Sequence, residues 1–175
     1  MKKCTLGLGC FWGPEENFKN KPGIVDTEVG YAGGHNPVVS YEEVCRGNTG
    51  HAEVVRLTFD EKIISFKKIL DLFFKMHDPT QKDMQFPDIG TQYRSEIFYE
   101  DEDQKKEAKE VLEIFNKELN GKIQTNISQL KNYCKAEEYH QRYFEKNRYE
   151  TTCYYGMVGK KYWSSKSTRC YLVFA

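Results

Sequence analysis

Cys10 lies in a stretch that is typical of a reactive thiol. In LGCFWGPEEN the cysteine stands between a glycine and two aromatic residues, and Pro14, Glu15 and Glu16 follow. Glycine lets the backbone turn sharply, while proline and acidic residues suit the first turn of a helix. Cys10 is therefore predicted on a strand-to-helix turn, where the helix N-terminus favours the nucleophilic thiolate. A small buried cysteine with no reactivity is the alternative.

A carboxyl group is the second candidate for chemistry. Glu53 follows the turn Gly50-His51-Ala52 and begins the apolar run Val54-Val55. Burial at such a position raises the pKa of a carboxyl group, which then stays protonated near neutral pH. Glu53 could therefore serve as a general acid, although a solvated glutamate at a strand end is the more common situation.

A polar loop supplies the third group of candidates. The segment PDIGTQYRS places a carboxylate, a phenol and a guanidinium close together in Asp88, Tyr93 and Arg94. Long loops inside a compact domain are often functional. Without other evidence, however, this segment indicates only a polar loop.

Strands and helices that must position these residues are predicted from apolar periodicity, β-branched runs and capping residues. Strands are expected at 4–8, 24–32, 53–59, 95–99 and 122–128, and a terminal strand is considered at 171–174. Helices are expected at 15–21, 66–77, 101–119 and 137–147, with a helical turn at 40–44. Because the elements lack a regular βαβ rhythm, an α+β fold with a mixed-sheet sandwich is predicted. Residues 1–175 are expected to form a single catalytic domain, in which 148–175 is an irregular C-terminal tail.

Composition narrows the classes of partner. The 26 basic and 26 acidic residues balance, so bulk charge does not indicate nucleic acid or an acidic membrane as a partner. No segment approaches the apolar length of a membrane span. A cytoplasmic protein is expected, whose six cysteines are reduced unless one pair is catalytic. The cysteines and histidines lack zinc-site spacing, so no metal is expected.

Four segments resemble signatures of the A-type peptide methionine sulfoxide reductases. They occur in order between Cys4 and about Asn147, and they read GCFWG, SYEEVCRGNTGHAEVV, PDIGTQYRS and AEEYHQRYFEKN. This resemblance implies reduction of methionine S-sulfoxide, free or in proteins, with electrons from thioredoxin and with no metal or organic cofactor. It also implies an α+β sandwich with a ferredoxin-like (split βαβ) core. We expect a monomer.

The resemblance also implies roles for individual residues. Cys10 would be the nucleophile and Glu53 the acid. Phe11 and Trp12 would form a wall for the substrate methyl group. The hydroxyls of Tyr41 and Tyr93 would bind the sulfoxide oxygen, and the carboxylate of Asp88 would orient the substrate.

The resemblance is weakest for the second thiol, which would form a disulfide with the oxidised Cys10. Family members often carry this thiol in a glycine-rich tail, whereas the tail after Asn147 holds little glycine. Cys153 is the first candidate for a resolving thiol and Cys170 the second, while direct reduction of Cys10 by an external thiol is the third route. The other cysteines are expected to be packed: Cys4, Cys45 and Cys134.

Two other functions are compatible with the residues alone. One is a Cys–His acyl-transfer enzyme in which His51 or His140 is the base for Cys10. The other is a catalytically silent protein that binds ligands with a polar and an apolar end.

Overall fold

The computed structural model describes residues 1–147, and its centre is one mixed sheet of six strands. The order across the sheet is β7-β6-β1-β3-β2-β8. Neighbouring strands are antiparallel except for the parallel pair β6 and β7. Their bounds are β1 Lys2–Leu8, β2 Ile24–Ala32, β3 Ala52–Phe59, β6 Ser95–Tyr99, β7 Asn126–Gln129 and β8 Cys134–Lys135.

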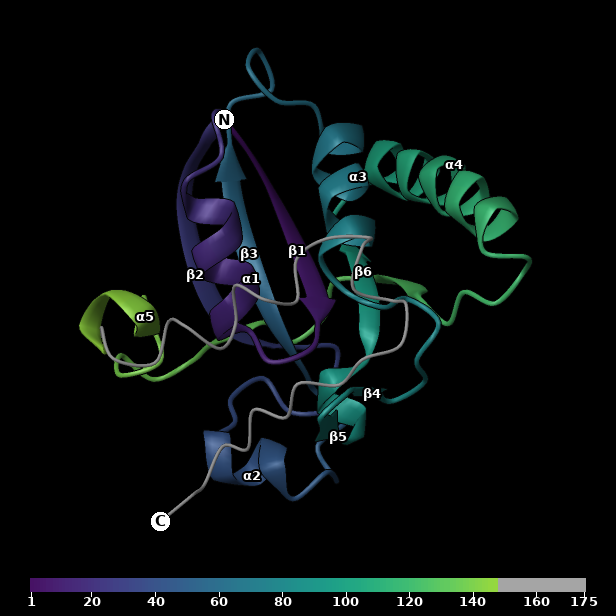
Figure 1. The fold of residues 1–175 in the computed structure, drawn as a ribbon. Coiled ribbons are helices and arrows are strands. Elements are labelled where there is room, and N and C mark those ends of the chain that lie inside the picture. Colours follow the sequence, from purple (N-terminus) through teal and green to yellow (C-terminus); the bar gives the residue numbers. More distant parts are fainter. Residues whose placement is uncertain (148–175) are drawn as a thin grey trace.

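Three helices cover one face of this sheet. Figure 1 shows α1 over β2 and β3, α3 on the other side of β1, and α4 beyond α3, and the contacts of α1 with β2 and β3 and of α3 with β1 agree with this. The bounds of these helices are α1 Trp12–Lys19, α3 Phe66–Met76 and α4 Glu102–Glu118. α3 begins at a side-chain cap, because the Ser65 hydroxyl accepts a hydrogen bond from the Lys68 amide. Its apolar residues recur at helical spacing and therefore lie on one side.

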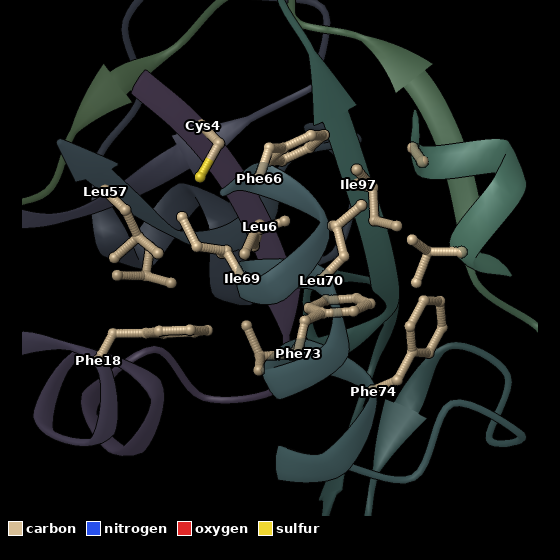
Figure 2. Close-up of a cluster of buried hydrophobic side chains, with 14 of the residues drawn as sticks. Cys4, Leu6, Phe18, Leu57, Phe66, Ile69, Leu70, Phe73, Phe74 and Ile97 are labelled. Carbon is tan, nitrogen blue, oxygen red and sulfur yellow. The ribbon is translucent and has the colours of Figure 1, made fainter. Parts of the chain in front are cut away.

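The main hydrophobic core lies between these helices and the sheet (Figure 2). Alternate residues of a strand point to the same face, so β3 sends Val55 and Leu57 into this core. Phe18 of α1 meets them there, together with Ile69 and Phe73 of α3. The same alternation directs Glu53 toward the helical side of the sheet, which decides its role below.

Shorter elements follow the strands at the end of the sheet where β1 ends. They are α2 Tyr41–Cys45, β4 Met84–Gln85, β5 Asp88–Ile89, the 3₁₀ helix η1 Thr91–Tyr93, and α5 Tyr143–Lys146. In Figure 1 α2, β4 and β5 lie below β1, and α5 lies to one side, beyond β2. β4 and β5 pair as a small hairpin of their own. This end of the molecule therefore carries most of the polar candidates named from the sequence.

The predicted elements are largely confirmed within residues 1–147, as is a mixed sheet with helices. The predicted helix at 137–147 is wrong for most of its length, because only Tyr143–Lys146 is helical. Arg142 has a left-handed backbone with φ 51°, which ends any helix that arrives from Glu137. The strand expected at 122–128 is shorter and displaced, and β8 was not predicted. Residues 148–175, with the strand considered at 171–174, lie outside the described part.

Candidate active site

Cys10 occupies the turn between β1 and α1, as the sequence predicts, and is partly exposed. Gly9 before it has φ 91°, a conformation that favours glycine, and a Cβ there would lie 2.9 Å from the Gln85 side chain. The helix begins at Trp12, so Pro14 is its third residue rather than its first. Proline is tolerated there because the first amides of a helix have no intrahelical acceptor. The thiol therefore stands at a helix start where a substrate can reach it.

Glu53 is almost fully buried, at 2% exposure, on the helical side of β3. Its Oε2 accepts a hydrogen bond of 3.1 Å from the backbone amide of Phe11. Burial raises the pKa of Glu53 to about 8; the Phe11 amide opposes this shift, and the charge of Asp88 adds to it. The Glu53 carboxyl group is therefore predominantly protonated at pH 7, and it is hydrogen-bonded to the backbone amide of the residue that follows Cys10.

Two phenols come from separate short elements. Tyr41 is the first residue of α2 and Tyr93 the last residue of η1. Burial raises the pKa of both hydroxyls well above the ordinary range, and the charge of Glu53 acts in the same direction. Cys45, at the other end of α2, also raises the pKa of Tyr41. Both phenols therefore remain protonated hydrogen-bond donors over any ordinary pH range.

Asp88 reaches the same region from β5. Gln85 and Asp88 are directly paired across the small hairpin, so their side chains share one face. Gln85 packs against the Gly9 turn, which places that face toward Cys10. Burial raises the pKa of Asp88. The hairpin thus brings a second carboxyl group next to the site.

The two aromatic residues after Cys10 differ in exposure. Phe11 is buried at 1% exposure, with its ring 5.9 Å from Tyr31 and 5.1 Å from His140, centre to centre. Trp12 is partly exposed. Of the two residues of the expected wall, Trp12 is therefore accessible from the surface, whereas Phe11 is packed in the interior.

Comparison with known proteins decides the family. The family model of peptide methionine sulfoxide reductase matches residues 2–169. This chain belongs to the peptide methionine sulfoxide reductase family. The peptide methionine sulfoxide reductase MsrA of Pelagibacter ubique is 58% identical over 146 residues, which cover 83% of this chain and 99% of that protein.

Solved structures agree with this membership. Mxr1 from Saccharomyces cerevisiae in reduced form has a TM-score of 0.82 and 41% identity, covering 87% of this chain and 88% of that one. A structure of the same yeast protein in complex with Trx2 has a TM-score of 0.58 and 30% identity, covering 81% and 84%.

In this family member, Tyr143 and His140 hold Trp12 in place; the sequence suggested His140 only as a possible base and gave Tyr143 no role in the site. The ring of Tyr143 stacks on the indole at 3.7 Å with 8° between the planes. The indole Nε1–H donates to His140 Nδ1 at 3.1 Å. An indole nitrogen can only donate, so Nδ1 of His140 must be unprotonated. The aromatic spacing in EEYHQRYF was the only sequence signal for this clamp.

Both histidines of the acyl-transfer hypothesis have structural partners. The Nδ1 atom of His140 is occupied by Trp12, and burial lowers the pKa of this imidazole. His51 is 1% exposed, and its Nε2 lies 3.2 Å from the backbone oxygen of Asn132. Its ring also fills the space beside Gly34. These contacts and the family membership both disfavour the acyl-transfer hypothesis.

The remaining cysteines divide by exposure. Cys4 is fully buried in the core, as expected, and Cys134 is partly exposed. The expectation that Cys45 is packed is wrong, because it is exposed at the end of the five-residue α2, whose buried residue is Val44. Cys153 and Cys170 lie outside the described residues.

Within residues 1–147, no group of three or more His, Cys, Asp or Glu side chains could hold a metal ion. No helix in this range has the length and apolar character needed to cross a membrane.

Proposed function

We propose that this chain reduces the S-sulfoxide of methionine to methionine, with Cys10 as the nucleophile and Glu53 as the acid. The observation that carries these roles is the buried Glu53 carboxyl group, which is hydrogen-bonded to the amide directly after Cys10 and has a pKa of about 8. A carboxyl group that keeps its proton at neutral pH next to a reachable thiol is suited to chemistry that must protonate an oxygen.

The surrounding residues match the two ends of the substrate. Methionine sulfoxide carries a polar oxygen and an apolar methyl group on the same sulfur, so its site needs donors on one side and an apolar surface on the other. We assign the donors to the Tyr41 and Tyr93 hydroxyls and the apolar surface to Trp12, with Phe11 behind it. Asp88 is assigned to orient the rest of the substrate. Donors that already point at the oxygen stabilise the charge that develops there.

The proposed chemical step transfers one oxygen atom between two sulfurs. The Cys10 thiolate attacks the sulfoxide sulfur and forms an S–S bond, and Glu53 gives its proton to the oxygen as the S–O bond breaks. The released hydroxide then attacks the Cys10 sulfur, and the S–S bond breaks with its electron pair going to the methionine sulfur. The products are methionine and the sulfenic acid of Cys10, so the thiol is oxidised by two electrons and the sulfoxide is reduced by two. A second thiol then condenses with the sulfenic acid to a disulfide and water.

Thioredoxin is the proposed electron donor, and the yeast Mxr1–Trx2 complex supports this partner. It would open the disulfide by thiol exchange. Cys153 remains the first candidate for the resolving thiol, ahead of Cys170 and of direct reduction of Cys10. Mass spectrometry after one turnover without reductant distinguishes these routes, since it would detect a Cys10–Cys153 disulfide, a Cys10–Cys170 disulfide or a lone sulfenic acid.

The order of the central strands supports a more specific fold. We propose that β6, β1, β3 and β2 form a ferredoxin-like core, and their order and antiparallel directions support it. Residues 1–175 would form one catalytic domain with 148–175 as its C-terminal tail. The protein would act as a cytoplasmic monomer without a metal or organic cofactor.

A direct test replaces the nucleophile. Cys10→Ser should abolish methionine formation from methionine sulfoxide in the presence of a dithiol, whereas Cys134→Ser should retain it. Full activity in Cys10→Ser would contradict the proposal. Binding of the sulfoxide without turnover by the unaltered protein would instead support the silent binder.

A further inference from the structure

The side chain of Arg94 connects two segments that approach the site from different parts of the sequence. Arg94 lies between η1 and β6, and its side chain is 14% exposed. Its NH1 donates to the Thr91 backbone oxygen at 2.9 Å, and its NH2 donates to the Gly50 backbone oxygen at 3.1 Å. Its Nε donates to Glu96 Oε2 at 2.5 Å. All three kinds of guanidinium nitrogen are therefore occupied.

The two carbonyl groups belong to the segments that carry the proposed hydrogen donors. Thr91 begins η1, whose last residue is Tyr93. Gly50 stands three residues before Glu53, just ahead of β3. Going further than the proposed function, on which this inference rests, we propose that Arg94 is a positioning residue that fixes the Glu53 carboxyl group relative to the Tyr93 hydroxyl.

Arginine suits this task for geometric reasons. Its guanidinium is planar and rigid, so two carbonyl groups bound by one fork are held at a fixed separation. The single ammonium of lysine cannot reproduce that fork. Glu96 is buried, with a side-chain exposure of 6%, and its carboxylate balances the guanidinium charge. Arg94 can therefore hold the Gly50 and Thr91 segments without placing an unbalanced positive charge near Glu53.

The neighbouring backbone leaves room for this arrangement. Gly33 has φ 85°, and a Cβ there would lie 3.2 Å from Arg94 NH2 and 2.7 Å from the Phe98 ring. A side chain at position 33 would therefore press on the guanidinium and on the ring beside it. Three separate segments thus meet at one side chain, which is more than a surface ion pair requires.

The first experiment uses Arg94→Lys in the full chain, with Arg56→Lys as the matched control. Arg56 lies on β3 and pairs with Glu100 at 3.2 Å, so the control changes an arginine of the same sheet that binds no site loop. Single-turnover formation of the Cys10 sulfenic acid is measured against substrate concentration. A displacement of about 1 Å costs on the order of 100-fold in rate, so we expect Arg94→Lys to slow the maximal step 10- to 100-fold, with a smaller change in the half-saturating concentration. Arg56→Lys should match the unaltered protein.

A second variant separates positioning from folding. Removing Arg94 alone would leave Glu96 buried without its partner, so Arg94→Met is combined with Glu96→Gln. Rates are measured at a temperature where circular dichroism shows each variant to be folded. Slowing in both the folded Arg94→Lys variant and the folded double variant supports the proposal. An unchanged maximal rate in either, even with a lower melting temperature, would overturn it.

The two proposals fail in different ways. If the unaltered protein forms no methionine, the proposed function itself is wrong. If the unaltered protein turns over and the Arg94 variants keep its rate, only the positioning role is wrong.

Discussion

At the scale of single residues, burial rather than residue type decides what Glu53 can do. A solvated glutamate is ionised at neutral pH and has no proton to give. At 2% exposure, facing one backbone amide and near another carboxyl group, Glu53 keeps its proton until about pH 8. Burial, which disfavours the charged form of Glu53, therefore also leaves it with a proton to donate near neutral pH.

Glu53→Gln therefore tests the acid directly. The glutamine oxygen can still accept the Phe11 amide, but the side chain has no acidic proton, so we expect sulfenic-acid formation to slow about 100- to 1,000-fold. The unaltered enzyme should also lose rate as pH rises through about 8, because the acid is then deprotonated. Single-turnover rates across pH 6 to 10 measure both effects. A glutamine variant with the unaltered rate would rule out Glu53 as the acid, and Glu28→Gln on β2 serves as the control.

Trp12 depends on a neighbour for its orientation, and a double-mutant cycle can measure this dependence. His140→Phe keeps a ring beside Phe11 but removes the acceptor of the indole N–H. A buried donor left without a partner costs about 1–3 kcal/mol, so we expect a 5- to 50-fold loss in kcat/KM for methionine sulfoxide. In a Trp12→Phe background the same change should have little further effect. Equal losses in both backgrounds would show that His140 does not act through Trp12.

At the scale of elements, the segment that carries His140 and Tyr143 is attached to the sheet by polar contacts. The Gln141 amide accepts from the Val29 amide and donates to the Val29 carbonyl, both at 2.9 Å. The Glu15 carboxylate accepts from the Arg142 amide at 2.8 Å, which ties this segment to α1. The two residues that contact Trp12 are therefore held in place by Gln141, whose side chain pairs with the β2 backbone as a neighbouring strand would, and by Glu15.

Gln141→Leu should detach this segment. It would leave the buried Val29 amide without its partner, whereas the Val29 carbonyl would still accept the Ala136 amide at 3.1 Å. We therefore expect a loss of about 1–3 kcal/mol in the free energy of unfolding. Urea denaturation measures it, with the exposed Gln129→Leu on β7 as the control. Equal stability in the two variants would show that the Val29 contacts contribute little.

The same segment shows where prediction from sequence ends. Strands and helices with a clear apolar period, such as β3 and α3, were predicted within a few residues. Residues 137–147 contain helix formers, but Gln141 and Glu137 bind distant partners in β2 and α2 instead of their own helix. Such long-range contacts leave no local period, and the two-residue β8 leaves none either.

At the scale of the whole molecule, the sequence predicted candidates for the reacting residues but not the long-range contacts that position them. The sequence around Cys10 and at the start of β3 indicated a thiol and an acid because glycines, an apolar run and charged residues lie within a few positions of each other there. Positions such as Arg94 and Tyr143 act through contacts across more than 40 positions of the chain, to Gly50 and Trp12. No spacing in the sequence reports these contacts.

The buried carboxyl groups also predict how stability depends on pH. The pKa of Glu53 is raised to about 8 and that of Glu15 to about 7, mainly by burial, so the folded state holds protons that the unfolded chain releases. These two groups lower stability as pH rises toward these values, and the buried histidines, whose pKa values are lowered, partly offset this. We therefore expect a net loss of about 1–2 kcal/mol between pH 6.5 and 8. Urea denaturation across this range measures it. In Glu53→Gln the loss should shrink by more than half, and an unchanged slope would contradict a protonated Glu53.

The central claim is that the thiol of Cys10 takes the oxygen atom of the sulfoxide. One turnover without reductant, using a variant with Cys153→Ser and Cys170→Ser, measures this most directly. The account predicts one methionine per protein molecule and one sulfenic acid, trapped by dimedone and located at Cys10 by mass spectrometry. Methionine formation with the trapped oxygen at another cysteine, or with Cys10 unmodified, would contradict it.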